Sequence, residues 1–300
     1  MKMILRVLAL GLASCLVPAW GGEPGARIRV ATLNTVLTEV ARQVGGDRVE
    51  VVGIVAPGVD PHSFNPSPSD VRALVDAEIV LASGLNMEAY LDRLVVSVGP
   101  RGRVVAVGNE LPIVLDLPGS PGRVEKDPHW WHSIGNVILS ADLVRREFTR
   151  LRPQNAEEFA ANAEGYSARL RELEAWVSSE VGRLPPGRRH LVTSHDAFGY
   201  FARDYGFTVH AINGLSTEGE ADARNVAGLI DLIRRERIGA VFAENSVDPR
   251  LVENLVRETG VRLGGTLYAD GLGPPGSGAE TYEQMYRHNV GAIVGALAMP

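Results

Sequence analysis

Residues 155–184 read NAEEFAANAEGYSARLRELEAWVSSEVGRL and form the longest periodic stretch of the 300-residue chain. Apolar side chains recur in this stretch at steps of three and four residues, at Phe159, Ala163, Tyr166, Leu170, Leu173, Val177 and Val181. Such steps place side chains on one face of an α-helix. A helix of about 29 residues, with a rise of about 1.5 Å per residue, is about 43 Å long. This length exceeds what one ordinary lobe needs, so we predict a spine helix that joins two lobes.

Short apolar runs alternate with amphipathic stretches on both sides of this segment. Such alternation is typical of strands crossed by helices in an α/β sheet. In the first half, the predicted strands are residues 28–33, 49–55, 79–83 and 104–107, and the predicted helices are 36–44, 69–75, 87–98 and 134–151. In the second half, the predicted strands are 190–193, 208–212, 240–242 and 263–267, and the predicted helices are 197–205, 221–236, 249–259 and 282–298. We assign the chain to the α/β class, with two similar lobes that each hold a mainly parallel sheet flanked by helices and face each other across a ligand cleft.

The same segmentation gives the domain organisation. The predicted parts are a signal peptide at 1–21, an N-terminal lobe at 27–153, the linking helix at 154–184 and a C-terminal lobe at 185–300. The signal peptide is indicated by Lys2 and Arg6, which precede an apolar run too short to span a bilayer. Its cleavage would release the mature protein into the periplasm.

Cys15 is the only cysteine and supports a second interpretation of the N-terminus. Leu12-Ala13-Ser14-Cys15 resembles a bacterial lipobox, which would leave Cys15 as a lipid-bearing first residue. In either case the mature chain has no disulfide and no thiolate ligand, so a metal site must use histidines and carboxylates. The net charge of −6 argues against a nucleic-acid partner, because such proteins carry a basic patch or stripe.

Four potential metal ligands stand at the ends of predicted elements. His62 lies in the proline-braced loop GVDPHSFNPSPSD at 58–70, His129 precedes a helix, and His195 and Asp270 follow strands. Open α/β sheets bind ligands at the carboxyl ends of their strands. Three imidazoles and one carboxylate suit tetrahedral Zn(II), whereas Mn(II) prefers more carboxylate oxygen. We predict a zinc site.

Six ordered motifs make nearly the whole mature chain similar to a known family, the metal-binding proteins of bacterial zinc and manganese ABC importers (the ZnuA/TroA-like cluster A-I). The motifs are Asp60-Pro61-His62 with Pro66 and Pro68; Asp127-Pro128-His129 with Trp131; residues 194–201, SHDAFGYF; residues 214–218, GLSTE; residues 241–244, VFAE; and residues 267–273, LYADGLG, with Thr281-Tyr282 and Met285.

The resemblance implies a metal held between two lobes and delivered to the membrane permease of an ABC importer. The ligands it implies are His62, His129, His195 and Asp270. Manganese and iron members typically have glutamate at the position of His195, so the resemblance favours zinc. We expect a monomer, and a metallochaperone is a further candidate partner. The His-rich loop that many zinc members carry is missing from residues 117–126, which contain no histidine.

The remaining histidines and glutamates receive subsidiary predictions. His132 follows His129 by three residues, and we place it beside the site or at the surface rather than among the ligands. His190 is predicted to be exposed. Ligating histidines usually donate their second N–H to an acceptor, and three glutamates are candidates for that role: Glu218, Glu220 and Glu244.

Two alternative functions remain open from the sequence. The first is a manganese or iron carrier of the same architecture. The second is a zinc-dependent hydrolase, but a catalytic zinc keeps an open coordination position that four protein ligands would close. Ser194-His195-Asp196 cannot form a catalytic triad either, because consecutive side chains on a strand point to opposite faces. We therefore predict a binding protein and not an enzyme.

Overall fold

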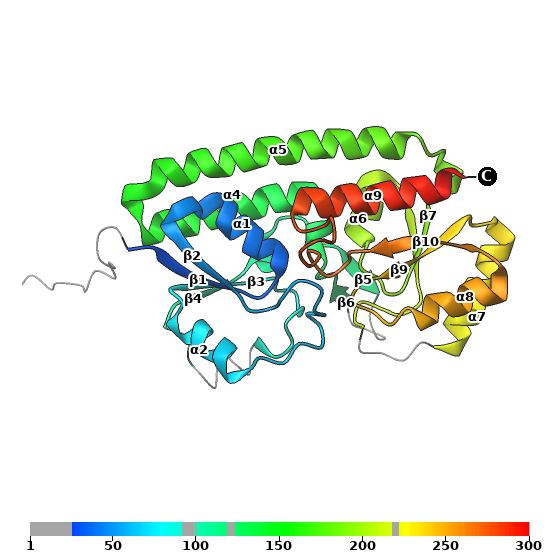
Figure 1. The fold of residues 1–300 in the computed structure, drawn as a ribbon, viewed down its shortest axis with the longest axis horizontal. Helices are drawn as coiled ribbons and strands as arrows, with labels where there is room; N and C mark the ends of the chain where they lie inside the picture. Colours follow the sequence, from blue (N-terminus) through cyan, green and yellow to red (C-terminus); the bar gives the residue numbers. More distant parts are fainter. Residues whose placement is uncertain (1–25, 92–98, 100, 119–123, 218–221, 300) are drawn as a thin grey trace, which may run out of the picture.

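The structure is a computed structural model, and it describes residues 26–91, 99, 101–118, 124–217 and 222–299. It has a mixed α/β fold in which two four-stranded parallel sheets lie along one long helix (Figure 1). The predicted signal peptide and Cys15 lie outside the described residues, and so do Glu218 and Glu220. No helix in the described ranges has the length and apolar character needed to cross a membrane.

The two sheets share one topology. The first contains β1 (Ile28–Thr32), β2 (Val49–Gly53), β3 (Ile79–Ala82) and β4 (Arg103–Ala106) in the order β2-β1-β3-β4. The second contains β7 (His190–Thr193), β8 (Thr208–Ala211), β9 (Ala240–Glu244) and β10 (Arg262–Leu267) in the order β10-β9-β7-β8. In each sheet the first strand in sequence pairs in parallel with both the second and the third. Two similar lobes are therefore confirmed at the level of strand order.

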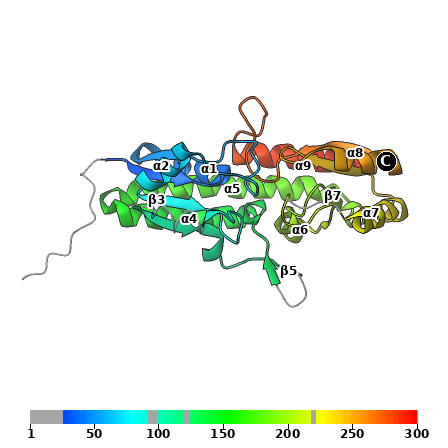
Figure 2. The same cartoon turned by 90° about the horizontal axis from the view of Figure 1, so that it is seen from below.

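Helices cover both sheets and connect them. Those of the first half are α1 (Thr35–Gly45), α2 (Pro68–Asp76) and α4 (Ile134–Leu151), and those of the second are α6 (Gly199–Tyr205), α7 (Ala223–Glu236), α8 (Arg250–Thr259) and α9 (Tyr282–Ala298). Figure 2 shows the two halves side by side, with a small hairpin of β5 (Asp116–Pro118) and β6 (Val124–Lys126) projecting from one face. This hairpin was not predicted, because its strands are only three residues long.

The spine helix is α5, Ala156–Gly182. All seven apolar side chains on its predicted face are buried, and α5 packs against α1 and α4 of the first half and against α9 of the second. The largest apolar cluster accordingly contains side chains from both halves, such as Val40 of α1 and Val290 of α9. The long helix is therefore part of one continuous core that joins the lobes.

Two local predictions need correction. The helix predicted at 69–75 is α2, which begins at Pro68 and has Ser67 as its N-cap: the Ser67 hydroxyl accepts from the Asp70 N–H, and the Asp70 carboxylate accepts from the Ser67 N–H at 2.7 Å. Proline is favoured at the first helical position because its missing N–H has no partner there anyway. The helix therefore begins at Pro68, one residue earlier than predicted. Met87 to Tyr90, the start of a predicted helix, form turns instead, and residues 92–98 lie outside the described part.

Candidate metal centre

Four side chains from distant parts of the chain converge on one point between the halves. His62, His129, His195 and Asp270 each offer one ligand atom, and these atoms all lie within 4.8 Å of one another. His129 and His195 are fully buried, Asp270 is buried, and the His62 side chain is only 6% exposed. Each half supplies two of the four residues, which are those predicted from the sequence.

The spacing of these atoms can be compared with a coordination geometry. The Nε2 atoms of the histidines and Oδ1 of Asp270 are separated by 3.2 Å (His62–His129), 3.3 Å (His129–His195), 3.4 Å (His62–Asp270), 3.6 Å (His129–Asp270) and 3.3 Å (His195–Asp270). Zinc–ligand bonds of about 2.0–2.2 Å at tetrahedral angles place neighbouring ligand atoms about 3.3–3.6 Å apart. The five distances therefore agree with the edges of a tetrahedron built around one zinc ion.

The folds of the two halves explain why these side chains meet. His195 follows β7 and Asp270 follows β10, so both leave the carboxyl edge of the second sheet. The point where strand order reverses in that sheet lies between β7 and β9, which is where open α/β sheets bind ligands. Glu244, the last residue of β9, lies at the same edge.

The two Asp-Pro-His motifs of the first half share one hydrogen bond, from the backbone N–H of the histidine to the carboxylate of the aspartate. In the first, Oδ1 of Asp60 accepts from the backbone N–H of His62 at 2.8 Å; in the second, Oδ1 of Asp127 accepts from that of His129 at 2.9 Å. These bonds fix the turn from which each imidazole projects. Asp60 also accepts from the Thr217 hydroxyl at 2.6 Å, which ties the His62 loop to the second half.

The buried imidazoles are oriented by carboxylates behind them. Nδ1 of His129 lies 2.9 Å from Oδ1 of Asp127, and Nδ1 of His195 is hydrogen-bonded to Glu244. Because a carboxylate only accepts, each Nδ1 carries the proton, and the lone pair on Nε2 points into the cluster. Of the three glutamates predicted as candidates for this role, Glu244 is hydrogen-bonded to His195, and Glu218 and Glu220 lie outside the described residues. The same role of Asp127 was missed, although the repeated Asp-Pro-His spacing was its sequence signal.

Asp270 faces the same point with an oxygen that lacks a donor. Its Oδ2 accepts from the Ser246 hydroxyl at 2.6 Å, whereas its buried Oδ1 has no hydrogen-bond partner. Two imidazole lone pairs and a carboxylate oxygen therefore point at one another with no donor between them. Such a set is stable only when a cation or protons occupy the middle.

The pKa values of the buried groups show that protons can supply the positive charge that the cluster needs when no metal is bound. Burial alone would lower the pKa of His195, but the charges of Glu244 and Asp270 outweigh burial and raise this pKa well above its ordinary value. Burial would lower the pKa of His129 too, but the hydrogen bond to Asp127 and the nearby carboxylate of Asp270 outweigh burial and raise this pKa. Burial would raise the pKa of Asp270, but the charge of His195 and the closeness of the other imidazoles hold it well below its ordinary value. The site therefore attracts positive charge strongly.

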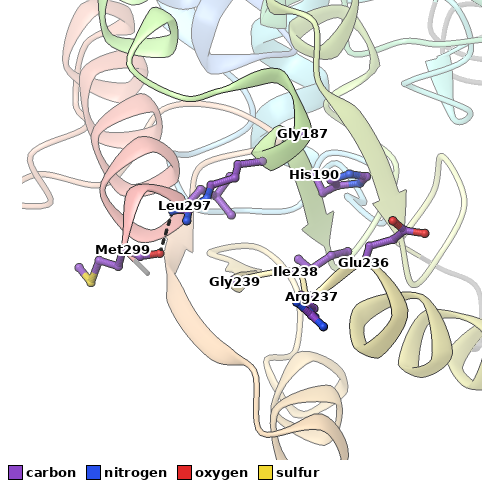
Figure 3. A pocket seen from close by; sticks show the side chains of 9 residues that line it. Gly187, His190, Glu236, Arg237, Ile238, Gly239, Leu297 and Met299 are labelled. Atoms are coloured by element: carbon purple, nitrogen blue, oxygen red, sulfur yellow. Dashed lines mark hydrogen bonds between the residues drawn. The ribbon is translucent and has the colours of Figure 1, made fainter.

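Of the other histidines, His132 is buried beside the centre, whereas His190 and His210 lie away from it. His190 and His210 lie near the opposite, amino end of the second sheet, where His190 lines a pocket with Glu236 and Arg237 (Figure 3). Nδ1 of His190 is 3.1 Å from Nε2 of His210, so the prediction that His190 is exposed was wrong: the side chain is half-buried by a pairing between adjacent strands.

Comparison with known proteins identifies the architecture. The family model "Zinc-uptake complex component A periplasmic" (ZnuA) matches residues 30–296. The chain belongs to the ZnuA family. The manganese-binding lipoprotein MntA of Bacillus subtilis is 35% identical over 291 residues, which cover 95% of both proteins. The zinc-binding protein TroA of Treponema pallidum is 35% identical over 301 residues, which cover 97% of both.

A solved structure agrees with these relatives. The periplasmic zinc-binding protein TroA of Treponema pallidum matches with a TM-score of 0.85 at 33% identity, over 92% of this chain and 100% of that one. This ZnuA-family chain is a metal-binding substrate-binding protein of an ABC transporter, with a metal ion as its ligand and an importer permease as its partner. The family consists of binding proteins and not enzymes, which excludes the hydrolase alternative.

Removing the carboxylate that is hydrogen-bonded to His195 should test whether Glu244 orients this imidazole. We expect Glu244→Gln to weaken metal binding by about 10- to 100-fold, because a neutral amide holds the His195 imidazole and its tautomer less firmly. Metal affinity measured by competition with a chromophoric chelator would check this. Glu236→Gln, which changes an exposed glutamate at the end of α7, should leave the affinity unchanged. Equal affinities for the wild type and Glu244→Gln would contradict the assigned role.

Proposed function

We propose that this protein captures Zn(II) outside the inner membrane and delivers it to its ABC permease. The proposed ligands are Nε2 of His62, His129 and His195 and Oδ1 of Asp270. The observation that carries the proposal is the agreement of five interatomic distances, 3.2–3.6 Å, with a tetrahedron around zinc. The predominance of imidazole over carboxylate supports the same choice.

Manganese is the second candidate cargo. It is favoured by the similarity to MntA of Bacillus subtilis, which is named a manganese-binding lipoprotein. The similarity to TroA, named a zinc-binding protein, is of the same size. Sequence identity therefore does not separate the two metals, and the ligand set is the basis of our choice.

Further parts of the proposal concern the domains, the location and the partners. We propose lobes at 27–153 and 185–300 that are joined by the helix at 154–184, which agrees with one sheet on each side of α5. We propose that residues 1–21 are a cleaved signal peptide of a periplasmic protein. The lipid-anchored alternative through Cys15 gains support from relatives named lipoproteins. A monomer, with a metallochaperone as a further partner, completes the proposal.

Elemental analysis of the purified mature protein tests the cargo directly. The protein is stripped with a chelator, offered equimolar zinc and manganese, and separated from free metal. One zinc per chain supports the proposal. Retention of manganese in preference to zinc would establish the second candidate instead, and retention of neither metal would refute both.

Metal preference should change when the ligand set becomes richer in carboxylate. We expect His195→Glu to lower the ratio of zinc to manganese affinity by about tenfold or more, since imidazole favours zinc and carboxylate oxygen favours manganese. The new carboxylate would face Glu244, so Glu244→Gln is added to remove the like-charge repulsion. Competition titrations with both metals measure the ratio, with Glu244→Gln alone as the control. An unchanged ratio in the double variant would count against imidazole as the source of the preference.

A further inference from the structure

His132 is a buried histidine that the four-ligand site does not use. Its side chain is 1% exposed, and it does not belong to the cluster of His62, His129, His195 and Asp270. Nε2 of His132 lies 2.8 Å from the carbonyl oxygen of Ala269. Because a carbonyl only accepts, this nitrogen carries a proton and has no lone pair to offer a metal.

The carbonyl that His132 holds belongs to the peptide group between Ala269 and Asp270. The orientation of this peptide group sets the direction in which the Asp270 side chain leaves the backbone. Nε1 of Trp131 donates to the same oxygen at 2.9 Å, so both lone pairs of the carbonyl are used. Both donors come from the first half of the chain, whereas Asp270 follows β10 of the second half.

His132 also contacts the chain beside two other ligands. Its backbone N–H donates to the carbonyl of His129 at 3.1 Å, within the short 3-10 turn Trp130–His132. Its ring packs on Phe198, three residues after His195, with the ring centroids 4.5 Å apart. The carbonyl of His132 accepts from the hydroxyl of Tyr286 in α9. The backbone of His132 is therefore held by two hydrogen bonds, and one face of its imidazole by Phe198.

After Asp270 in the sequence, a further hydrogen bond joins this segment to the first half. The hydroxyl oxygen of Thr35, in α1, accepts from the backbone N–H of Leu272 at 2.7 Å. The backbone is thus held just before Asp270 by Trp131 and His132 and two residues after it by Thr35. The backbone around Asp270, which follows β10 of the second half, is therefore held in place by hydrogen bonds from side chains of the first half.

We propose that His132 is a positioning residue for the metal: it fixes the Ala269–Asp270 peptide group, so that Oδ1 of Asp270 points at the three imidazoles. This inference rests on the proposed function of those four residues. It assigns His132 a role in retaining the ion rather than in coordinating it. Partners outside the coordination shell that orient a ligand typically change metal affinity by about 10- to 100-fold.

Zinc affinity and zinc release rate in position-132 variants test the proposal. His132→Phe keeps an aromatic ring on Phe198 but removes the donor, and we expect about 10- to 100-fold weaker binding, mainly through faster release. His132→Gln, which can place an amide N–H near the same carbonyl, should recover most of the loss. The matched control is His288→Phe, because Nε2 of His288 lies 2.9 Å from the carbonyl of Thr266 in β10, the strand that Ala269 follows, and His288 is not in the cluster. It should change the affinity by no more than about twofold.

A double-variant cycle separates positioning from general destabilisation. In an Asp270→Ala background, His132→Phe should weaken the residual zinc binding by no more than about twofold, since the ligand it positions is gone. An equal loss in both backgrounds, or no loss in the wild-type background, would overturn the proposal. If His132→Phe does not fold, His132→Asn, whose amide is too short to reach Ala269, takes its place in the cycle.

The same experiment separates this inference from the function beneath it. If His195→Ala and Asp270→Ala weaken zinc binding strongly while His132→Phe does not, the ligand set stands and only the role of His132 is refuted. If His195→Ala and Asp270→Ala bind zinc as well as the wild type, the ligand set itself is wrong, and the inference falls with it.

Discussion

Replacing His195 by alanine is expected to weaken zinc binding by about 10²–10³-fold. Sites with four protein ligands bind zinc with about 10–16 kcal/mol, so one ligand accounts for about 2.5–4 kcal/mol, and about 1.4 kcal/mol corresponds to a tenfold change. The loss should lie at the upper end, because His195 is fully buried and its removal leaves the carboxylate of Glu244 without its partner. Chelator competition at pH 7 measures the change.

A matched control lies on β7, the strand that His195 follows. His190 occupies the amino end of β7, and His190→Ala removes an imidazole outside the cluster. This variant should bind zinc like the wild type. If both substitutions weakened binding equally, the effect would come from the stability of the second sheet and not from coordination, and the ligand assignment of His195 would be wrong.

Zinc affinity is expected to fall by about 10²–10⁴-fold between pH 7 and pH 5. Only neutral imidazole binds the metal, so each proton that zinc must displace costs about tenfold in affinity per pH unit. The raised pKa values of His129 and His195 mean that the metal-free site already binds protons at the upper end of this range. Affinity therefore decreases as pH decreases, and one to two protons over two pH units give the stated range.

The carboxylate of the site should not contribute to this pH dependence. The pKa of Asp270 is held well below its ordinary value, chiefly because the charge of His195 outweighs burial, so this group stays ionised down to pH 5. Affinities measured across the range with a chelator of known pKa values would show the slope. In Glu244→Gln, the loss of the charge that raises the pKa of His195 should make the slope shallower. A flat profile would rule out a site made mainly of histidines.

The position of the site at the boundary between the halves has a physical consequence for uptake. Each half alone supplies only two of the four proposed ligands, and two protein ligands would hold zinc weakly. The Asp60–Thr217 and Thr35–Leu272 bonds cross the same boundary. If the four proposed ligands hold the ion, separation of the halves would divide them into two pairs and weaken its binding, which suits a protein that hands a metal ion to a permease.

The sequence by itself predicted most of the helices and strands and the four side chains that the structure brings together. The face of α5 could be predicted from steps of three and four residues because helical periodicity depends only on neighbours along the chain. His195 and Asp270 could be singled out because strand ends in α/β sheets bind ligands whatever the surrounding sequence. The Asp-Pro-His turns are also local, since their hydrogen bonds span two residues.

Only the tertiary structure decided which groups these side chains meet. Glu244 became the partner of His195 across 49 residues, and Ala269 that of His132 across 137 residues. The register of β7 and β8 sets His190 opposite Thr208, which makes His190 and His210 diagonal neighbours within hydrogen-bond distance. These contacts join residues that are far apart in the sequence. They form only after α5 has packed against helices of both halves and so fixed the relative position of the two sheets. No local preference of the chain encodes it, which is why the ligands could be predicted from the sequence and most of the groups that hold them could not.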